Sequence, residues 1–126
     1  MKSLKEIYKI KAPIEKVWDA LTNAKTIEKW GGGPVKMKAV ESSEFSFWGG
    51  DIKGINTKVI KEKELSQEWM SGDWDKYSKV NFKLNEKEGV TTVELTQSGI
   101  PDKEFMDIKD GWNRYYLGEI KALLEK

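Results

Sequence analysis

The sequence contains neither cysteine nor histidine. Without cysteine the chain has no disulfides, thiolate nucleophiles or sulfur ligands for metals, a composition that suits a reducing compartment. Without histidine it lacks the commonest general base near neutral pH and the commonest ligand of transition metals. Ser-His-Asp catalysis, Cys-His catalysis and zinc chemistry are therefore excluded, and we expect neither a metal nor another cofactor.

An excess of one charge and long apolar runs are missing as well. Lysine and arginine number 22 against 21 acidic residues, and the two signs are interleaved, so we expect no basic surface for nucleic acid. No segment approaches the ~20 apolar residues of a membrane helix, and the N-terminal stretch MKSLKEIYKIKA lacks the apolar run of a signal peptide. We therefore expect a soluble, cytoplasmic protein that does not insert into membranes.

What the sequence does contain is a hydrophobic period that changes along its 126 residues. Leu4 to Ala12 alternates as a half-buried strand does. The stretch APIEKVWDALT, and a second segment capped by Thr22 or Asn23 and ending at Gly31, have helical spacing. Period two then returns in six predicted strands, at residues 35–40, 43–48, 51–60, 65–71, 77–85 and 90–98. Residues 102–125 return to helical period.

The order of these elements predicts an α+β fold. Short, turn-rich separators between successive strands indicate hairpins, so that about seven strands form a curved antiparallel sheet. Such a sheet has one apolar face that needs a cover, and the terminal helix is the only element long enough to supply it. We predict a single domain, residues 1–126, in which two short helices follow the first strand and a long C-terminal helix lies across the concave face.

Several stretches of the chain resemble known families. The stretch IKAPIEKVWDALTNAKTIEKW resembles the opening of START-like (SRPBCC), helix-grip proteins. The tail GIPDKEFMDIKDGWNRYYLGEIKALLE resembles the end of the C-terminal domain of Aha-type activators of the heat-shock protein 90 ATPase. Between them, GGDIKG and LSQEWM stand where this family has a glycine-bearing strand and a strand with a tryptophan.

The resemblance implies both a fold and a function. The helix-grip superfamily commonly has an apolar cavity between the sheet and the terminal helix. The narrower family implies a co-chaperone-like module that contacts a heat-shock protein 90 type chaperone. The eukaryotic activators have a separate N-terminal domain that contributes much of the stimulation, and this chain resembles only their second domain.

Four aromatic residues are candidates to line such a cavity: Trp69, Phe82, Trp112 and Tyr116. The alternative is that they fill the core, since aromatic side chains dominate core burial. Six tryptophans are many for a chain of this length, and both interpretations place Trp69 and Trp112 inside.

Two amides are also predicted to face inward. Alternation in the strand 65–71 turns Gln67 to the same side as Trp69, and parity in the preceding strand places Asn56 inward, unless a bulge reverses either residue. A buried amide needs hydrogen-bond partners from the protein, water or a ligand. Our hypothesis is that Gln67 meets a polar group in the cavity.

The terminal helix carries two further candidates. Advancing ~100° per residue places Glu119 on the apolar stripe beside Trp112 and Tyr116. A carboxylate buried there would have a raised pKa and would be a candidate acid or base; the alternative is that Glu119 reaches water at the cavity mouth. Arg114 projects away from the stripe, either as a partner-binding residue or as an ordinary ion pair with Asp110.

Trp74, in the turn-rich stretch SGDWD, is a second candidate to bind a partner. It either anchors the partner from an exposed loop tip or folds back over the cavity mouth.

Three classes of function remain. The first is a non-enzymatic, chaperone-associated module, and the second is a carrier or sensor of a small hydrophobic ligand. The third, an enzyme of cyclase or hydrolase type, would need carboxylates, lysine or tyrosine as acids and bases, and no paired constellation with suitable spacing is found.

Overall fold

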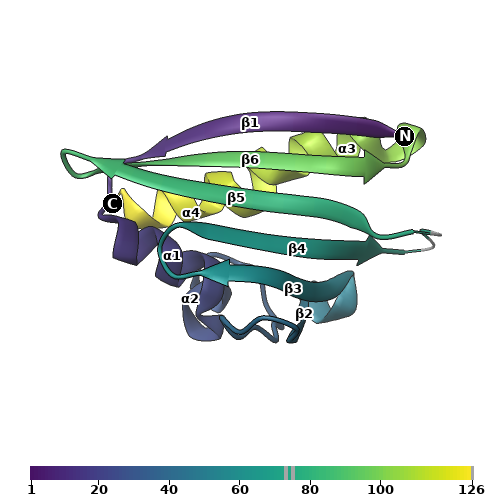
Figure 1. Cartoon of the computed structure of the whole chain (residues 1–126), viewed down its shortest axis with the longest axis horizontal. Helices are drawn as coiled ribbons and strands as arrows, with labels where there is room; N and C mark the ends of the chain where they lie inside the picture. Colours follow the sequence, from purple (N-terminus) through teal and green to yellow (C-terminus); the bar gives the residue numbers. More distant parts are fainter. Residues whose placement is uncertain (73, 75, 126) are drawn as a thin grey trace.

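A single antiparallel sheet dominates the computed structural model, which describes residues 1–72, 74 and 76–125 (Figure 1). Its strand order is β1-β6-β5-β4-β3-β2, so the first strand lies beside the last and the others form a meander. The strands are β1 Lys2–Ile10, β2 Glu44–Phe47, β3 Ile52–Ile60, β4 Glu64–Ser71, β5 Ser78–Lys87 and β6 Val90–Ile100. The predicted α+β, helix-grip architecture is confirmed.

The prediction of a strand at residues 35–40 is wrong. This segment makes one isolated bridge, between Lys36 and Ser46, and then leaves the sheet. Met37 turns its side chain into the core, and the carbonyl of Lys38 accepts a hydrogen bond from the buried Asn56 side chain. The backbone acceptor that would extend a ladder is therefore used by a side chain.

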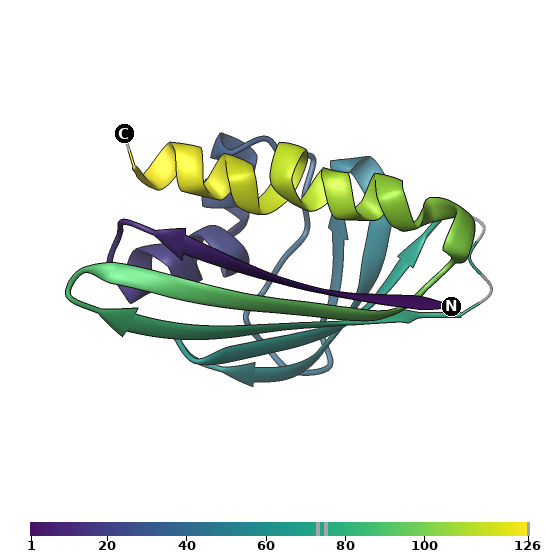
Figure 2. The same ribbon diagram turned by 90° about the horizontal axis from the view of Figure 1, so that it is seen from above.

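Two short helices, α1 Ile14–Thr22 and α2 Ala24–Lys29, connect β1 to the rest of the sheet. Of the two predicted caps, Asn23 is the one used: its side chain accepts a hydrogen bond from the Lys25 backbone amide at 3.0 Å. Both helices lie at the end of the molecule where the chain terminates (Figure 2).

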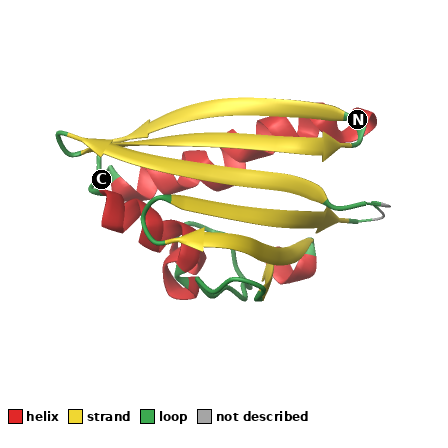
Figure 3. Ribbon diagram, in the orientation of Figure 1, coloured by secondary structure: helices red, strands yellow, loops and turns green. Residues whose placement is uncertain are grey.

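The terminal helix lies across the concave face of the sheet (Figures 2 and 3). It begins with a 3₁₀ turn, η2 Asp102–Glu104, and continues as α3 Phe105–Gly111. A π-helical turn, η3 Trp112–Tyr116, then leads into α4 Leu117–Leu124. Uniform helical spacing from 102 to 125 predicts the position of this element but not the π turn inside it.

The π turn changes which residues face the sheet. It inserts one extra residue, which rotates the following residues by about 100° relative to a regular α-helix. Leu117 and Ile120 are consequently buried, whereas Glu119 is exposed. The expected place of Glu119 on the apolar stripe is therefore wrong, because that expectation assumed an unbroken α-helical period.

Gly118 is tied to the same turn. A Cβ atom at this position would lie 1.7 Å from the carbonyl oxygen of Asn113, five residues earlier in the helix. A Cβ at Gly111 would meet only the Tyr115 ring, at 4.0 Å. Gly118 therefore makes room for a carbonyl of its own helix.

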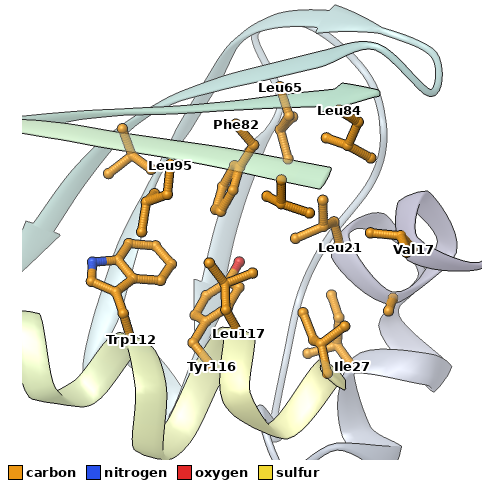
Figure 4. Close-up of a cluster of buried hydrophobic side chains, with 14 of the residues drawn as sticks. Val17, Leu21, Ile27, Leu65, Phe82, Leu84, Leu95, Trp112, Tyr116 and Leu117 are labelled. Carbon is orange, nitrogen blue, oxygen red and sulfur yellow. The ribbon is translucent and has the colours of Figure 1, made fainter. Parts of the chain in front are cut away.

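The core lies between the sheet and the terminal helix, and α1 and α2 close one end of it (Figure 4). In Figure 4 Trp112, Tyr116 and Leu117 project from the helix toward side chains of the sheet. Leu21 of α1 and Ile27 of α2 meet them from the side and are fully buried.

Candidate functional site

Aromatic side chains fill the space under the terminal helix. Tyr116 lies at their centre, with its ring centroid 4.7 Å from that of Trp112 and 4.9 Å from that of Trp30. Trp69 and Trp112 stack at 4.8 Å with an interplanar angle of 27°. Phe82 meets Trp112 edge-on at 5.6 Å. All four predicted aromatics are buried in the core, where they pack on one another.

The two predicted inward amides form a continuous relay. The indole N–H of Trp69 donates to Gln67 Oε1 at 2.7 Å, and Gln67 Nε2 donates to Asn56 Oδ1 at 2.9 Å. Asn56 Nδ2 then donates to the carbonyl of Lys38 at 2.9 Å and to Ser43 Oγ at 3.1 Å. Gln67 and Asn56 are buried as alternation predicts, and a register shift after Asn56 does not turn it outward.

This relay occupies both polar atoms of the Gln67 side chain, which was expected to meet a polar group in the cavity. Its oxygen and its amide nitrogen both have protein partners, Trp69 and Asn56. The polar group that Gln67 meets is thus part of the protein, and the amides act as a structural link between β4, β3 and the segment before β2.

A second relay was not foreseen. The indole N–H of Trp112 donates to Gln97 Oε1 at 2.8 Å, and Gln97 Nε2 donates to Ser78 Oγ at 3.0 Å. Ser78 Oγ in turn donates to the carbonyl of Ser98 at 2.6 Å. The available signal was a glutamine at an inward position of β6, the same signal that identified Gln67 in β4. Each of the two stacked tryptophans is therefore held by its own glutamine.

The Tyr116 hydroxyl has no such partner. It is fully buried, and no hydrogen bond to it is found among the described residues. Burial raises the pKa of Tyr116 far above its usual value, because the tyrosinate would be desolvated. The hydroxyl is therefore neutral at any physiological pH.

One open groove adjoins this aromatic core, and we call it the aromatic groove. It has a volume of about 480 Å³. One side is formed by the turn η1 (Trp48–Gly50), the start of β3 and the end of β4, and the other side by α3 and η3 of the terminal helix. Five aromatic side chains and two carboxylates line it: Trp48, Trp69, Trp112, Tyr115, Tyr116, Asp51 and Asp107. The Trp48 ring of η1 lies against Tyr116 of the terminal helix, with the ring centroids 6.2 Å apart.

Trp48 enters the aromatic groove from an unusual backbone. Its φ is 52°, in the left-handed region that costs a non-glycine residue roughly 1–3 kcal/mol. The surrounding structure holds it there: the Trp48 amide donates to the carbonyl of Gly32 at 2.9 Å, and its indole N–H donates to that of Gly31 at 2.7 Å. Trp48 is not among the residues predicted from the sequence, where its stretch WGGD reads only as a turn between two strands.

The remaining predicted residues lie apart from the aromatic groove. Glu119 is exposed and does not line it, so it is not a cavity residue. Arg114 is 64% exposed and forms the ordinary ion pair with Asp110, at 2.8 Å. Trp74 is half-buried instead of exposed, and its indole N–H donates to Glu104 at the start of the terminal helix.

Residues 1–72, 74 and 76–125 contain no cluster of three or more Asp and Glu side chains arranged to hold a metal ion. None of their helices is long and apolar enough to cross a membrane.

The fold and its terminal helix match a known family. The family described as "Activator of Hsp90 ATPase homolog 1-like protein" matches residues 11–125. The chain belongs to this family. An "Activator of 90 kDa heat shock protein ATPase homolog" from Dictyostelium discoideum is 29% identical to it over 108 residues, which are 82% of this chain and 28% of the relative.

Two solved structures extend the family match to the whole fold. The crystal structure of an HSP90 activator from Plasmodium falciparum has a TM-score of 0.90 and 26% identity, and covers 99% of this chain and 97% of that one. The solution structure of the Aha1 dimer from Colwellia psychrerythraea has a TM-score of 0.82 and 26% identity, with the same coverage. By contrast, this chain spans between 28% and 36% of the length of the curated relatives it matches.

Proposed function

We propose that this member of the activator family acts without catalysis, by binding a heat-shock protein 90 type chaperone. The observation that carries the proposal is the family match over residues 11–125. The similarity to the Plasmodium falciparum activator adds support, because it extends over 97% of a chain described as an activator. A cytoplasmic location, expected from the composition, would place the chain with such a chaperone.

The exposed side of α3 and η3 is the surface we assign to the chaperone. Ile7 and Met106 are 58% and 69% exposed, and both line a groove of about 470 Å³ between β1 and α3. Asp110, the ion-pair partner of Arg114, lines the same groove. An arginine beside exposed apolar side chains is typical of interface hot spots, where such residues contribute most of the binding energy. Trp74, held at the start of the same helix, is the second proposed contact.

Isothermal titration calorimetry with the chaperone of the same host tests this assignment. Arg114→Ala is expected to weaken binding about tenfold, as the loss of an interface hot spot does. Lys25→Ala is the matched control, because Lys25 is an exposed cation on α2, away from this surface, and its loss should leave the affinity unchanged. An absence of binding at high micromolar concentrations would contradict the proposal.

The binding of a small ligand is the second candidate function, and the aromatic groove is the observation that favours it. Ligand sites in proteins are concave, lined mostly by apolar and aromatic side chains, and about 300–1,000 Å³ in volume, which includes the 480 Å³ found here. The space deeper under the helix is occupied by the packed rings of Tyr116, Phe82 and Trp112. We therefore place the proposed ligand in the aromatic groove and not in an enclosed cavity.

A further inference from the structure

The charge around the aromatic groove specifies the kind of ligand that it would accept. Its two charged lining residues, Asp51 and Asp107, are both acidic. Lysine and arginine make up 22 of the 126 residues, yet none of the described ones lines the groove. Within the part of the chain that the structure describes, neither carboxylate is in an ion pair. The groove therefore has a local negative charge in a chain whose net charge is +1.

The tryptophan N–H groups around the groove support the same conclusion. The indole N–H groups of Trp48, Trp69 and Trp112 are all used within the protein, on Gly31, Gln67 and Gln97 respectively. The tryptophans thus have no N–H left to donate to an anion or a carbonyl. The π systems that a cation can reach are those of the half-buried Trp48 and the exposed Tyr115, and ring faces attract cations through their negative charge.

We propose that the aromatic groove binds an organic cation, a substituted ammonium group with an apolar surface. Aromatic rings bind such a group through cation–π attraction, and the carboxylates of Asp51 and Asp107, which belong to different elements, add attraction from two sides. A strongly hydrated inorganic cation would gain little from apolar walls, whereas an alkylated ammonium is weakly hydrated and fills them. The inference rests on the second proposed function, small-ligand binding, and adds the charge of the ligand.

Trp48 supports this role by its backbone. Residues held in left-handed conformations cluster at ligand sites, where the surrounding structure stabilises them. Three hydrogen bonds tie η1 to the segment 31–34: Trp48 N donates to Gly32 O, Trp48 Nε1 to Gly31 O and Gly49 N to Pro34 O. Asp51 N donates to Trp48 O within the turn itself. The groove wall that carries Trp48 and Asp51 is thereby formed before any ligand binds.

A titration with choline and with its neutral isostere, 3,3-dimethylbutan-1-ol, tests the charge requirement. The two molecules have the same shape and differ in one positive charge. The assay is the ¹H–¹⁵N NMR spectrum of the whole chain, with the indole signals of Trp48, Trp69 and Trp112 as reporters. Choline is expected to shift these signals and to bind about tenfold more tightly than the alcohol, with a preference that decreases as salt is added.

Variants then assign the charge to its residues. Asp51→Asn and Asp107→Asn are each expected to weaken choline binding about three- to tenfold and to leave the weak binding of the alcohol unchanged. Asp110→Asn is the matched control, since Asp110 lies on the same helix but pairs with Arg114 outside the groove.

The outcomes separate this inference from the function on which it rests. Equal binding of choline and the alcohol in the groove would overturn the charge requirement and leave small-ligand binding intact. An absence of shifts at the groove tryptophans with either molecule at 100 mM would overturn both. Choline binding that Asp110→Asn weakens as much as Asp51→Asn and Asp107→Asn would also overturn the assignment.

Discussion

Removing the hydroxyl of Tyr116 is expected to stabilise the fold. In most proteins a buried tyrosine hydroxyl has a hydrogen-bond partner, and its loss is destabilising. Here the oxygen is fully buried and no described protein group bonds to it. Phenylalanine keeps the ring that packs against Trp112 and Trp30, and it removes only the polar atom.

The magnitude follows from the desolvation of that atom. A buried polar group without a partner costs about 1–3 kcal/mol, so Tyr116→Phe should raise the free energy of unfolding by about 1–2 kcal/mol once small packing changes are allowed for. For a chain of 126 residues this corresponds to a rise of roughly 4–8 °C in the melting temperature. Tyr115→Phe is the matched control: Tyr115 is the adjacent residue and is 59% exposed, so no change is expected.

The same hydroxyl predicts how stability depends on alkaline pH. The pKa of Tyr116 is raised in the folded state, whereas in the unfolded chain it is about 10. Above pH 10 the unfolded chain therefore loses this proton while the folded chain retains it, so unfolding becomes more favourable as the pH rises. Urea denaturation at pH 8 and pH 11 should show a smaller loss of stability for Tyr116→Phe than for the natural chain. A destabilisation of 1 kcal/mol or more by Tyr116→Phe at pH 8 would refute the reasoning, because it would mean that the hydroxyl has a partner.

Two further predictions concern the helix and the amide relay. Gly118→Ala should destabilise the fold by more than about 2 kcal/mol, because the added Cβ would overlap the Asn113 carbonyl. Gly111→Ala is the control and should be neutral or stabilising by up to about 1 kcal/mol. Equal effects of the two substitutions in urea denaturation would contradict the assigned role of Gly118. Gln67→Met should cost about 1–3 kcal/mol, because it leaves the Trp69 indole N–H without an acceptor. In the Trp69→Phe background the same substitution should cost less, and an unchanged cost in that double-mutant cycle would show that the relay is not the cause.

Much of the fold follows from hydrophobic periodicity. Alternation located five of the six meander strands to within about two residues at each end, and it turned Asn56 and Gln67 inward correctly. These features depend on local sequence and on which face of a strand is buried. The segment 35–40 has the same alternation, but a long-range contact decides its structure, the hydrogen bond from Asn56 to Lys38.

The π turn marks the limit of the same reasoning for the helix. Helical spacing predicts Trp112 and Tyr116 inside, where they lie, and fails at Glu119, three residues after the turn ends. Gly111 and Gly118 both stand within the predicted helix at 102–125, yet only Gly118 is required by a close contact. No local pattern distinguishes them, because the contact depends on one extra residue in the turn.

The candidate site was predicted least well, because it joins residues from segments that are far apart in the sequence. The aromatic groove joins Trp48 and Asp51, from a turn, to Asp107 and Tyr115, on the terminal helix. None of these four stood out, because each position is ordinary in its own segment. Their proximity arises from the way the helix crosses the sheet, which the sequence pattern describes only as an arrangement of layers.

The central claim, association with a heat-shock protein 90 type chaperone, is tested most directly by NMR. The ¹⁵N-labelled chain is titrated with the unlabelled chaperone of the same host, and the backbone signals are followed residue by residue. We predict that signals on the exposed side of α3 and η3, including Met106 and Arg114, broaden or shift first, and that those of α2 stay unchanged. An unchanged spectrum at high micromolar chaperone, or perturbations confined to α2, would contradict it.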